Sequence, residues 1–476
     1  MIEESCLYLF TISHHSYLLS KMRFLLLIAS VVPLISPPVQ AANEVFAHVI
    51  VGNTPQYELA DWEDDIRLAQ EAKIDGFVLN IAFNDPNNSR SLDLAFQAAN
   101  DLGFKLFFSF DYLAQGPWPK EDVTAILQQF GPDPAYFKPD GARPFASTFE
   151  GPDNADDWPD IKAATDAFFV PDWSSVDPAE SVTLAGGVVD GLFSFEAWPT
   201  GDTNMTTDTD RQFLEALGRG EQGGRETQGG DGGAKAYMMP VAPWFFTNLP
   251  GLGKNWLWRG DELWDLRWRQ VAEVRPDFVE ILTWNDYGES HYIGPVWEKG
   301  AGLFAAFEAP IDYVAGMTHD GWRKLLPFYI DVYKAGGQVP AEVVEAVAAY
   351  YRPVPALACP SGGTTGNNKA FGETEVEPQE LVEDSVFYAA LLNTDEGVSV
   401  TVSIGGNELT GGFGRVPRAG PGTPGVYMGS VPFGDNTGDV VVKVARDGKP
   451  VATAEGGKKI STECENQVQN WNAVAV

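Results

Sequence analysis

Eight short apolar runs, separated by longer amphipathic stretches, dominate residues 45–282 of this 476-residue chain. The runs have the length and composition of strands that are buried on both faces. They occupy residues 45–51, 76–83, 104–112, 143–151, 167–173, 191–198, 236–244 and 278–282. Strands that alternate with helices form parallel sheets, and eight such units in series predict a closed (β/α)8 barrel of the TIM type. A doubly wound open sheet is the alternative, but no glycine-rich phosphate fingerprint follows the first run.

The stretches between the runs have helical periodicity. Leu59, Trp62, Ile66 and Ala69 fall on one face of the first stretch, as expected for a helix packed against a sheet. We expect the barrel to close with a helix at 322–333 that is kinked by a proline. Residues 218–233 are rich in glycine and charge, which predicts a surface loop that binds no phosphate.

The alternation of strand-like and helix-like segments ends near Pro353. A linker-like segment at 361–366 leads into short β-type runs separated by Gly and Asn turns. These runs occupy residues 385–392, 398–404, 426–431 and 440–444. The pattern predicts a barrel domain over 43–352 and a C-terminal β-sandwich domain over 353–476. We interpret the sandwich as a stabilising appendage rather than a sugar-binding module, because only Trp471 near its end suggests a ring platform.

The net charge and the N-terminal sequence indicate the class of partner and the cellular location of the protein. With 32 Lys+Arg against 66 Asp+Glu, the net charge of −34 excludes nucleic acid and anionic membranes as partners and suits a neutral substrate. A basic start at Lys21, an apolar segment and small residues ending at Ala41 and Ala42 predict a signal peptide over 1–42, with 1–21 as an upstream extension. We therefore expect a monomer that is secreted to the extracellular space or cell wall, without a membrane span.

Three cysteines are present, and Cys6 lies within or ahead of the predicted signal peptide. Cys359 and Cys464 remain, so an oxidising compartment predicts a disulfide between them. Closing a loop of this length stabilises a protein by roughly 4–5 kcal/mol in the chain-entropy model.

Polar side chains gather where the predicted strands end, which in a barrel is the catalytic mouth. Acids or amides stand at or near every strand end except the seventh, and aromatic rings accompany them. Stacking rings with carboxylates and amides suit a neutral polyol. The candidate substrate-binding residues are His48, Asn80, Asp111, Glu150, Asp172, Glu196, Trp198, Trp244, Trp284, Tyr287 and His291. His48 is either a substrate contact or a satisfied core residue.

The eighth run ends in two acids, Asp286 and Glu289, three residues apart. A turn there places both carboxyls on one side. Neighbouring acids in a cleft can separate their pKa values, which glycoside hydrolysis requires. A capped helix start is the alternative interpretation of the same spacing.

The sequence contains no motif for metal-dependent, cofactor-dependent or serine-nucleophile catalysis. No His-Glu-x-x-His pattern, cysteine cluster or EF-hand loop occurs, so we predict neither a metal nor a cofactor. A Gly-x-Ser-x-Gly elbow is absent too, which leaves two carboxylates as the best candidates.

Five fragments in order, FAHVIVGN (46–53), DGFVLN (75–80), FKLFFSFD (104–111), STFEG (147–151) and TWNDYGES (283–290), resemble glycoside hydrolase family 71, the fungal endo-α-1,3-glucanases or mutanases. The resemblance covers about residues 44–350. It implies hydrolysis of α-1,3-glucan with inversion, and it places the catalytic acids at Asp286 and Glu289. We expect Glu289 to be the acid and Asp286 the base; inversion needs carboxyls roughly 6.5–9.5 Å apart.

Two rival functions remain open at this stage. One is a related barrel that hydrolyses α-mannosides, whose strand ends can also read Trp-Asn-acid-aromatic. The other is a non-catalytic protein that binds wall polysaccharide.

Overall fold

The computed structural model describes residues 43–219, 235–297 and 302–476, and residues 41–476 form one compact unit. The predicted signal peptide and most of the predicted loop at 218–233 lie outside the described residues. Within the described part, no helix has the length and apolar character needed to cross a membrane.

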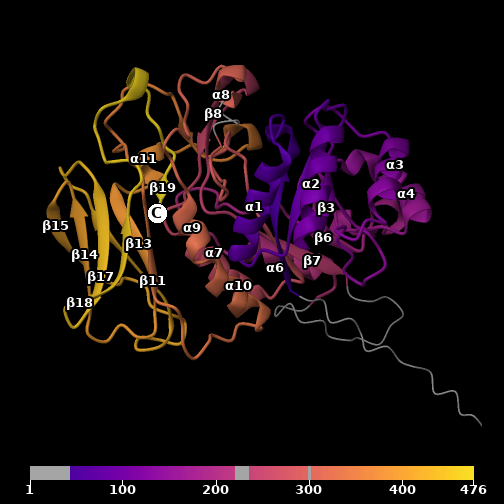
Figure 1. Cartoon of the computed structure of the whole chain (residues 1–476). Helices are drawn as coiled ribbons and strands as arrows, with labels where there is room; N and C mark the ends of the chain where they lie inside the picture. The colour runs from indigo at the N-terminus through magenta and orange to yellow at the C-terminus, as the bar shows by residue number, and fades with distance from the viewer. Residues whose placement is uncertain (1–42, 220–234, 298–301) are drawn as a thin grey trace, which may run out of the picture. The chain divides into compact units, whose positions relative to one another are not determined.

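Eight parallel strands form the predicted barrel (Figure 1). They are β1 (Glu44–Ile50), β2 (Gly76–Ala82), β3 (Lys105–Asp111), β4 (Phe145–Phe149), β5 (Phe168–Phe169), β6 (Gly191–Phe193), β7 (Ala236–Val241) and β10 (Phe278–Ile281). Their order in the sheet is β5-β4-β3-β2-β1-β10-β7-β6. Asp172 forms parallel bridges to Phe149 and to Phe193, so the ring is nearly closed between its two end strands. The predicted fold class is confirmed.

Helices follow most of the barrel strands, as the periodicity predicts. They are α1 (Leu59–Glu71), α2 (Asn88–Leu102), α3 (Lys120–Phe130), α4 (Trp158–Thr165), α5 (Pro178–Ser181), α6 (Asp208–Ala216), α7 (Leu263–Val274), α8 (Leu303–Ala306), α9 (Asp320–Lys324) and α10 (Leu326–Lys334). A further helix, α11 (Pro378–Leu381), lies in the C-terminal region. In α1 the buried face contains Trp62, Ile66 and Ala69. The helix expected at 322–333 is divided into two helices, α9 and α10. Pro327 stands in the first turn of α10, where a backbone N–H would have no partner within the helix, so the proline begins a helix there instead of kinking one.

Phenylalanines fill the amino-terminal end of the barrel. Phe107 packs against Phe145 and Phe46 with ring centroids 4.4 and 4.9 Å away, and Phe278 lies 5.3 Å from Phe145. Because side chains alternate across a strand, the next inward position on β1 is His48 and the next on β10 is Glu280. The barrel interior therefore changes from apolar to polar toward the carboxyl ends of its strands.

Two four-stranded antiparallel sheets form a C-terminal sandwich, whose first strand, at residues 346–351, lies before the predicted domain boundary at 353. One has the order β16-β13-β11-β19 and the other β15-β14-β17-β18. The strands are β11 (Ala346–Tyr351), β13 (Ser385–Leu392), β14 (Val398–Ile404), β15 (Asn407–Gly411), β16 (Gly425–Pro432), β17 (Val440–Arg446), β18 (Lys449–Glu455) and β19 (Val474–Ala475). The predicted disulfide between Cys359 and Cys464 is present, with Cα atoms 5.9 Å apart. Trp471 is buried beside Arg352, so it is no ring platform.

A small third sheet stands at the mouth of the barrel and has no counterpart among the predicted elements. Strands β8 (Phe246–Leu249) and β9 (Lys254–Leu257) form a hairpin, and β12 (Thr365–Gly366) pairs in parallel with β9. The third strand thus comes from the C-terminal region of the chain.

Candidate active site

The loop after β10 carries the two predicted catalytic acids and is tied to the end of β1. The Asn285 side chain accepts a hydrogen bond from the Ile50 amide at 2.8 Å and donates one to the Ile50 carbonyl at 3.1 Å. Within the loop, the Asp286 amide donates to Thr283 Oγ1 at 2.8 Å, and the Glu289 amide donates to Asp286 Oδ1 at 3.1 Å. The local sequence therefore builds a turn that holds both acids on one side.

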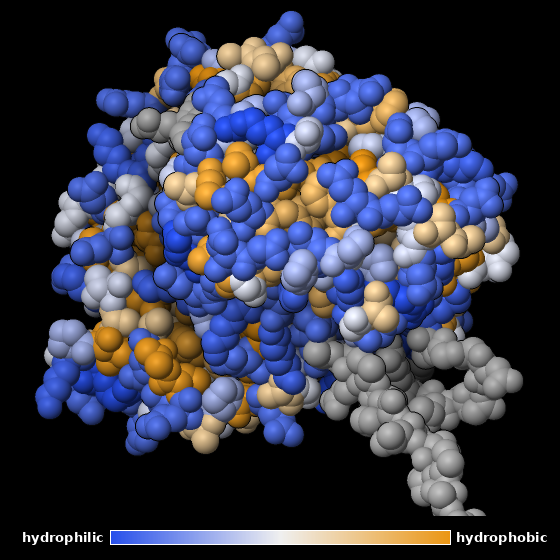
Figure 2. Space-filling view, turned by 45° about the vertical axis from the view of Figure 1, so that its right-hand side comes forward, coloured by the Kyte–Doolittle hydropathy of each residue, from blue (hydrophilic) through white to orange (hydrophobic). Residues whose placement is uncertain are grey.

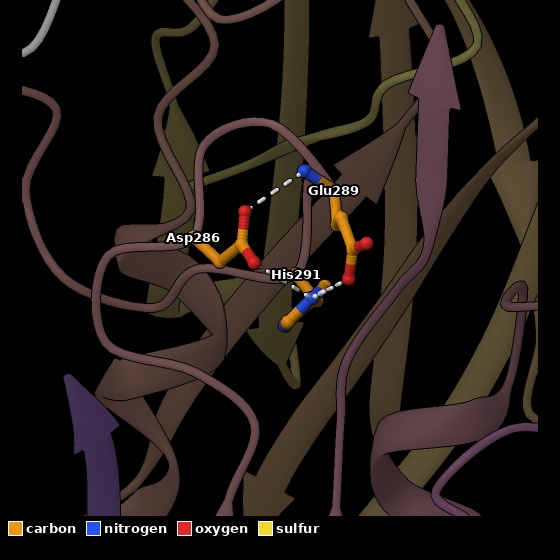
Figure 3. Close-up of side chains that lie close together, drawn as sticks. All are labelled: Asp286, Glu289 and His291. Atoms are coloured by element: carbon orange, nitrogen blue, oxygen red, sulfur yellow. Dashed lines mark hydrogen bonds and ion pairs between the residues drawn. The ribbon is translucent and has the colours of Figure 1, made fainter. Parts of the chain in front are cut away.

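Asp286 and Glu289 face one another across this turn, with His291 beside them (Figure 3). His291 Nε2 lies 3.0 Å from Glu289 Oε2 and 3.7 Å from Asp286 Oδ2. On its other oxygen, Glu289 Oε1 pairs with Lys254 Nζ at 2.6 Å. The side chains of Asp286 and Glu289 are 21% and 17% exposed, so both remain accessible to a small group at the mouth.

The two carboxyls have opposite pKa shifts. Burial raises the pKa of Asp286, and the negative charge of Glu289 raises it further. Burial acts in the same direction on Glu289, but Lys254 and His291 outweigh it and hold the pKa of Glu289 well below its ordinary value. The Asp286 carboxyl therefore holds a proton more readily than the Glu289 carboxyl, which is opposite to the order expected from the sequence.

Three of these groups have the chemistry of metal ligands. One ligand atom each from Asp286, Glu289 and His291 lies within 4.8 Å of the others. However, Glu289 already has the Lys254 ammonium on one oxygen and the His291 ring on the other. A divalent ion would have to displace these contacts, so the arrangement fits a hydrogen-bonded pair of acids better than a metal centre.

Asn80 and Asp111 lie at the same mouth. Asp111 Oδ1 accepts hydrogen bonds from the Leu113 and Ala114 amides, both at 2.8 Å, and its carboxyl also interacts with the Asn80 side chain. Burial raises the pKa of Asp111, although His48 acts against the shift. Asp111 also interacts electrostatically with Lys254, which connects it to the Asp286–Glu289 pair.

His48 lies below the mouth, inside the barrel. Its Nδ1 is 2.6 Å from Glu280 Oε1, and both side chains are buried. Of its two predicted roles, the structure therefore gives His48 that of a paired core residue. Glu280 was missed by the sequence analysis, although an acid within an otherwise apolar strand was the signal that could have found it.

Glu150 and Asp172 form a second acidic pair, at the ends of the fourth and fifth strands. Glu150 accepts hydrogen bonds from the Ser175 amide at 3.0 Å and from the Ser175 hydroxyl at 2.5 Å. Burial raises the pKa of Asp172 well above its ordinary value, and the nearby Glu150 adds to the shift. Glu196, by contrast, is exposed and accepts a hydrogen bond from Thr209 at 3.1 Å.

One of the predicted aromatic residues reaches the site. Trp198 is half-buried, stacks on Trp258 at 5.3 Å and meets the His291 ring edge at 5.1 Å. Trp258 belongs to the unpredicted third-sheet region and was missed for that reason.

The structure contradicts the predicted contact role of the other three aromatic residues, which are buried in the core. Trp244 donates its indole N–H to the Trp471 carbonyl at 3.1 Å. Trp284 packs against Phe77 at 5.0 Å, and Tyr287 donates to the Pro295 carbonyl at 2.9 Å. The position of Trp244 after the seventh strand, and of Trp284 and Tyr287 beside the acids, did not reveal that these side chains turn away from the mouth.

An eight-stranded parallel barrel with a split pair of carboxyls beside aromatic rings at its mouth is an arrangement of glycoside hydrolases. Residues 41–476 match the family model of glycosyl hydrolase family 71, and the chain belongs to this family.

Named relatives and solved structures accompany this match. A mutanase from Penicillium rubens is 35% identical over 431 residues, covering 88% of this chain and 86% of the relative. A glucan endo-1,3-alpha-glucosidase from Schizosaccharomyces pombe is 32% identical over 459 residues, covering 91% and 94%. A family 99 endo-alpha-mannosidase structure from Bacteroides thetaiotaomicron, 14% identical, aligns with a TM-score of 0.44 over 62% of this chain and 98% of that one.

Proposed function

We propose that this protein is a secreted endo-α-1,3-glucanase, which hydrolyses the α-1,3-glucosidic bonds of fungal wall α-glucan or of mutan. The observation that carries the proposal is the Asp286–Glu289 pair at the mouth of the barrel, where the surroundings raise the pKa of Asp286 and lower that of Glu289. The two relatives, a mutanase and a glucan endo-1,3-alpha-glucosidase, indicate the substrate class. The disulfide supports secretion, since such bonds persist in oxidising compartments. N-terminal sequencing of the protein in the medium checks removal of residues 1–42.

Hydrolysis needs both charge states of the pair at once. The protonated carboxyl donates its proton to the glycosidic oxygen as the bond to the anomeric carbon breaks. If the reaction inverts, the ionised carboxyl takes a proton from the attacking water, whose oxygen forms the new bond to that carbon; if it retains, the ionised carboxyl forms that bond first and water then displaces it. The Trp198–Trp258 stack beside His291 offers ring faces to the apolar faces of glucose units.

The distance between the carboxyls bears on stereochemistry. One oxygen of Asp286 lies within 4.8 Å of one oxygen of Glu289, which is less than the roughly 6.5–9.5 Å that accommodates an attacking water between them. The separation therefore gives no support to inversion, which the family resemblance implies. Proton NMR of the first-formed product decides: a β-anomer demonstrates inversion and an α-anomer retention.

The central test replaces each acid by its amide. We expect Asp286→Asn and Glu289→Gln each to lower the rate of hydrolysis by about 10²-fold or more, because each removes one proton-transfer group. The assay incubates each variant with insoluble α-1,3-glucan and measures the soluble products by chromatography, with yeast mannan as the competing substrate. Glu71→Gln, an exposed acid on α1, is the matched control.

The outcome separates the competing functions. Near-native activity in both amide variants would remove the pair from the mechanism. Products from mannan alone would favour the mannosidase, and binding of glucan without any product in the wild type would favour the non-catalytic protein. An aryl α-glucoside assigns the roles, since a good leaving group needs no proton and the variant without the acid then keeps its activity.

A further inference from the structure

The β8–β9 hairpin contacts Glu289 at two points. Lys254 Nζ, on β9, lies 2.6 Å from Glu289 Oε1. The amide of Phe246, which begins β8, donates a hydrogen bond to the Glu289 carbonyl at 3.0 Å. The hairpin therefore holds both the side chain and the backbone of this acid.

Lys254 provides a positive charge beside the acidic side chains of the site. In the described part of the chain, no other Lys or Arg forms an ion pair with Asp286 or Glu289. The Lys254 ammonium also interacts with Asp286 and Asp111, so it faces three acids. A buried carboxylate is costly without a paired cation, and this contact lowers that cost for Glu289.

The opposite edge of the strand that carries Lys254 is held by a distant segment. On β12, Thr365 pairs with Trp256 and Gly366 with Leu257. The Asn367 amide donates to the Leu257 carbonyl at 2.8 Å, and Asn255 Nδ2 donates to the Gly362 carbonyl at 2.8 Å. The residue next to Lys254 is thus tied to a segment about one hundred positions later in the chain.

We propose that Lys254 is a positioning residue, which keeps the Glu289 carboxylate charged and oriented for hydrolysis, and that β12 from the C-terminal region holds Lys254 in place. The inference rests on the proposed function, because it needs Glu289 to act in catalysis. By this inference the C-terminal region helps to position an active-site residue, in addition to the stabilising role that the sequence predicts for it.

Lys254→Met tests the first part, since it removes the charge and keeps most of the side-chain length. We expect kcat to fall about tenfold or more. We also expect the acidic limb of the pH–rate profile to move up by at least one pH unit, because Glu289 then holds its proton at higher pH. Lys254→Arg keeps the charge and should restore the position of the limb. Lys73→Met, which removes an equally short ion pair to Asp331 on the surface, is the matched control.

Gly366→Val tests the second part. A Cβ at Gly366 would stand 2.5 Å from the Val376 carbonyl oxygen, so a larger side chain displaces β12. We expect the acidic limb to move in the same direction as in Lys254→Met, with the thermal unfolding midpoint of each variant measured alongside as a check on folding.

The results distinguish this inference from the proposed function. A wild-type pH profile and kcat in Lys254→Met overturn the positioning role, and a wild-type profile in Gly366→Val overturns the role of β12. If Glu289→Gln remains inactive in either case, the proposed function stands. Full activity in Glu289→Gln removes Glu289 from the mechanism and overturns the inference, whereas a wild type that releases no product from α-1,3-glucan overturns the proposed function.

Discussion

Three carboxyl groups outside the Asp286–Glu289 pair have pKa values raised to near neutral pH. Burial raises the pKa of Glu44, Asp65 and Asp261 to about 7 in each case. Asp65, on α1, accepts hydrogen bonds from Trp297 Nε1 at 3.0 Å and from the Tyr57 hydroxyl at 3.1 Å. A neutral Asp65 carboxyl can accept both hydrogen bonds without the free-energy cost of a buried charge. Because its pKa differs between the folded and unfolded states, this single residue makes the stability of the protein depend on pH.

Asp65→Asn should make stability less dependent on pH. The folded-state pKa of Asp65 is about 7 against an ordinary value of 3.8, so its favourable contribution is complete below pH 3.8 and is lost as pH rises through 7. The amide stays neutral, and the variant should gain on the wild type between pH 4 and pH 7 by up to about 4 kcal/mol. Thermal unfolding of both proteins across this range measures the effect; parallel pH curves would contradict it.

At the scale of elements, one buried ion pair connects two helices and a strand. Arg267 on α7 donates to both carboxylate oxygens of Asp210 on α6, at 2.6 and 2.8 Å, and to the Pro240 carbonyl of β7 at 3.0 Å. Asp210 also accepts from the Tyr237 hydroxyl at 2.7 Å. Neither charged side chain is exposed, so the geometry of this side of the barrel depends on the completeness of the network.

Arg267→Met should lower the free energy of unfolding by about 3–5 kcal/mol, because it leaves the Asp210 charge buried without its partner. Urea unfolding measures the change. Arg211→Met on α6 is the control, since its ion pairs to Asp208 and Glu273 are half-exposed and longer, at 3.7 and 3.5 Å, and should contribute under about 1 kcal/mol. Equal losses in the two variants would show that burial of the pair is not what matters.

At the scale of the whole molecule, the end of the chain joins the sandwich to the barrel. The Ala475 amide donates to the Thr318 carbonyl at 2.7 Å, and Trp471 receives the Trp244 indole N–H on its carbonyl. The disulfide between Cys359 and Cys464 closes a loop of 105 residues that contains β12 to β18. Hydrophilic residues predominate on the face in Figure 2, with apolar side chains in groups between them, in keeping with the net charge of −34.

Replacing both cysteines, Cys359→Ser with Cys464→Ser, should lower stability by up to about 4–5 kcal/mol, because the unfolded chain regains the freedom that the closed loop removes. Differential scanning calorimetry measures the change in the unfolding midpoint. The wild type unfolded with a reducing agent should match the double variant. An unchanged midpoint in both would mean that the bond contributes nothing to global stability.

Local periodicity determined the elements of this protein. Apolar runs and amphipathic stretches predicted the eight barrel strands, and alternation with turn residues predicted β13 and β14 with the observed bounds. The spacing of Asp286 and Glu289 predicted a shared turn, in which the Glu289 amide donates a hydrogen bond to the Asp286 side chain three residues earlier. These features are encoded within a few residues, so the sequence alone was sufficient for them.

Only the tertiary structure decided which groups surround the acids and which face away. Lys254 reaches Glu289 across 35 positions, Glu280 reaches His48 across 232, and β12 returns to β9 from about one hundred positions away. Trp244, Trp284 and Tyr287 turned into the core because the loops that carry them pack on segments remote in sequence. Contacts of this range follow from strand order and loop packing, which local patterns do not contain.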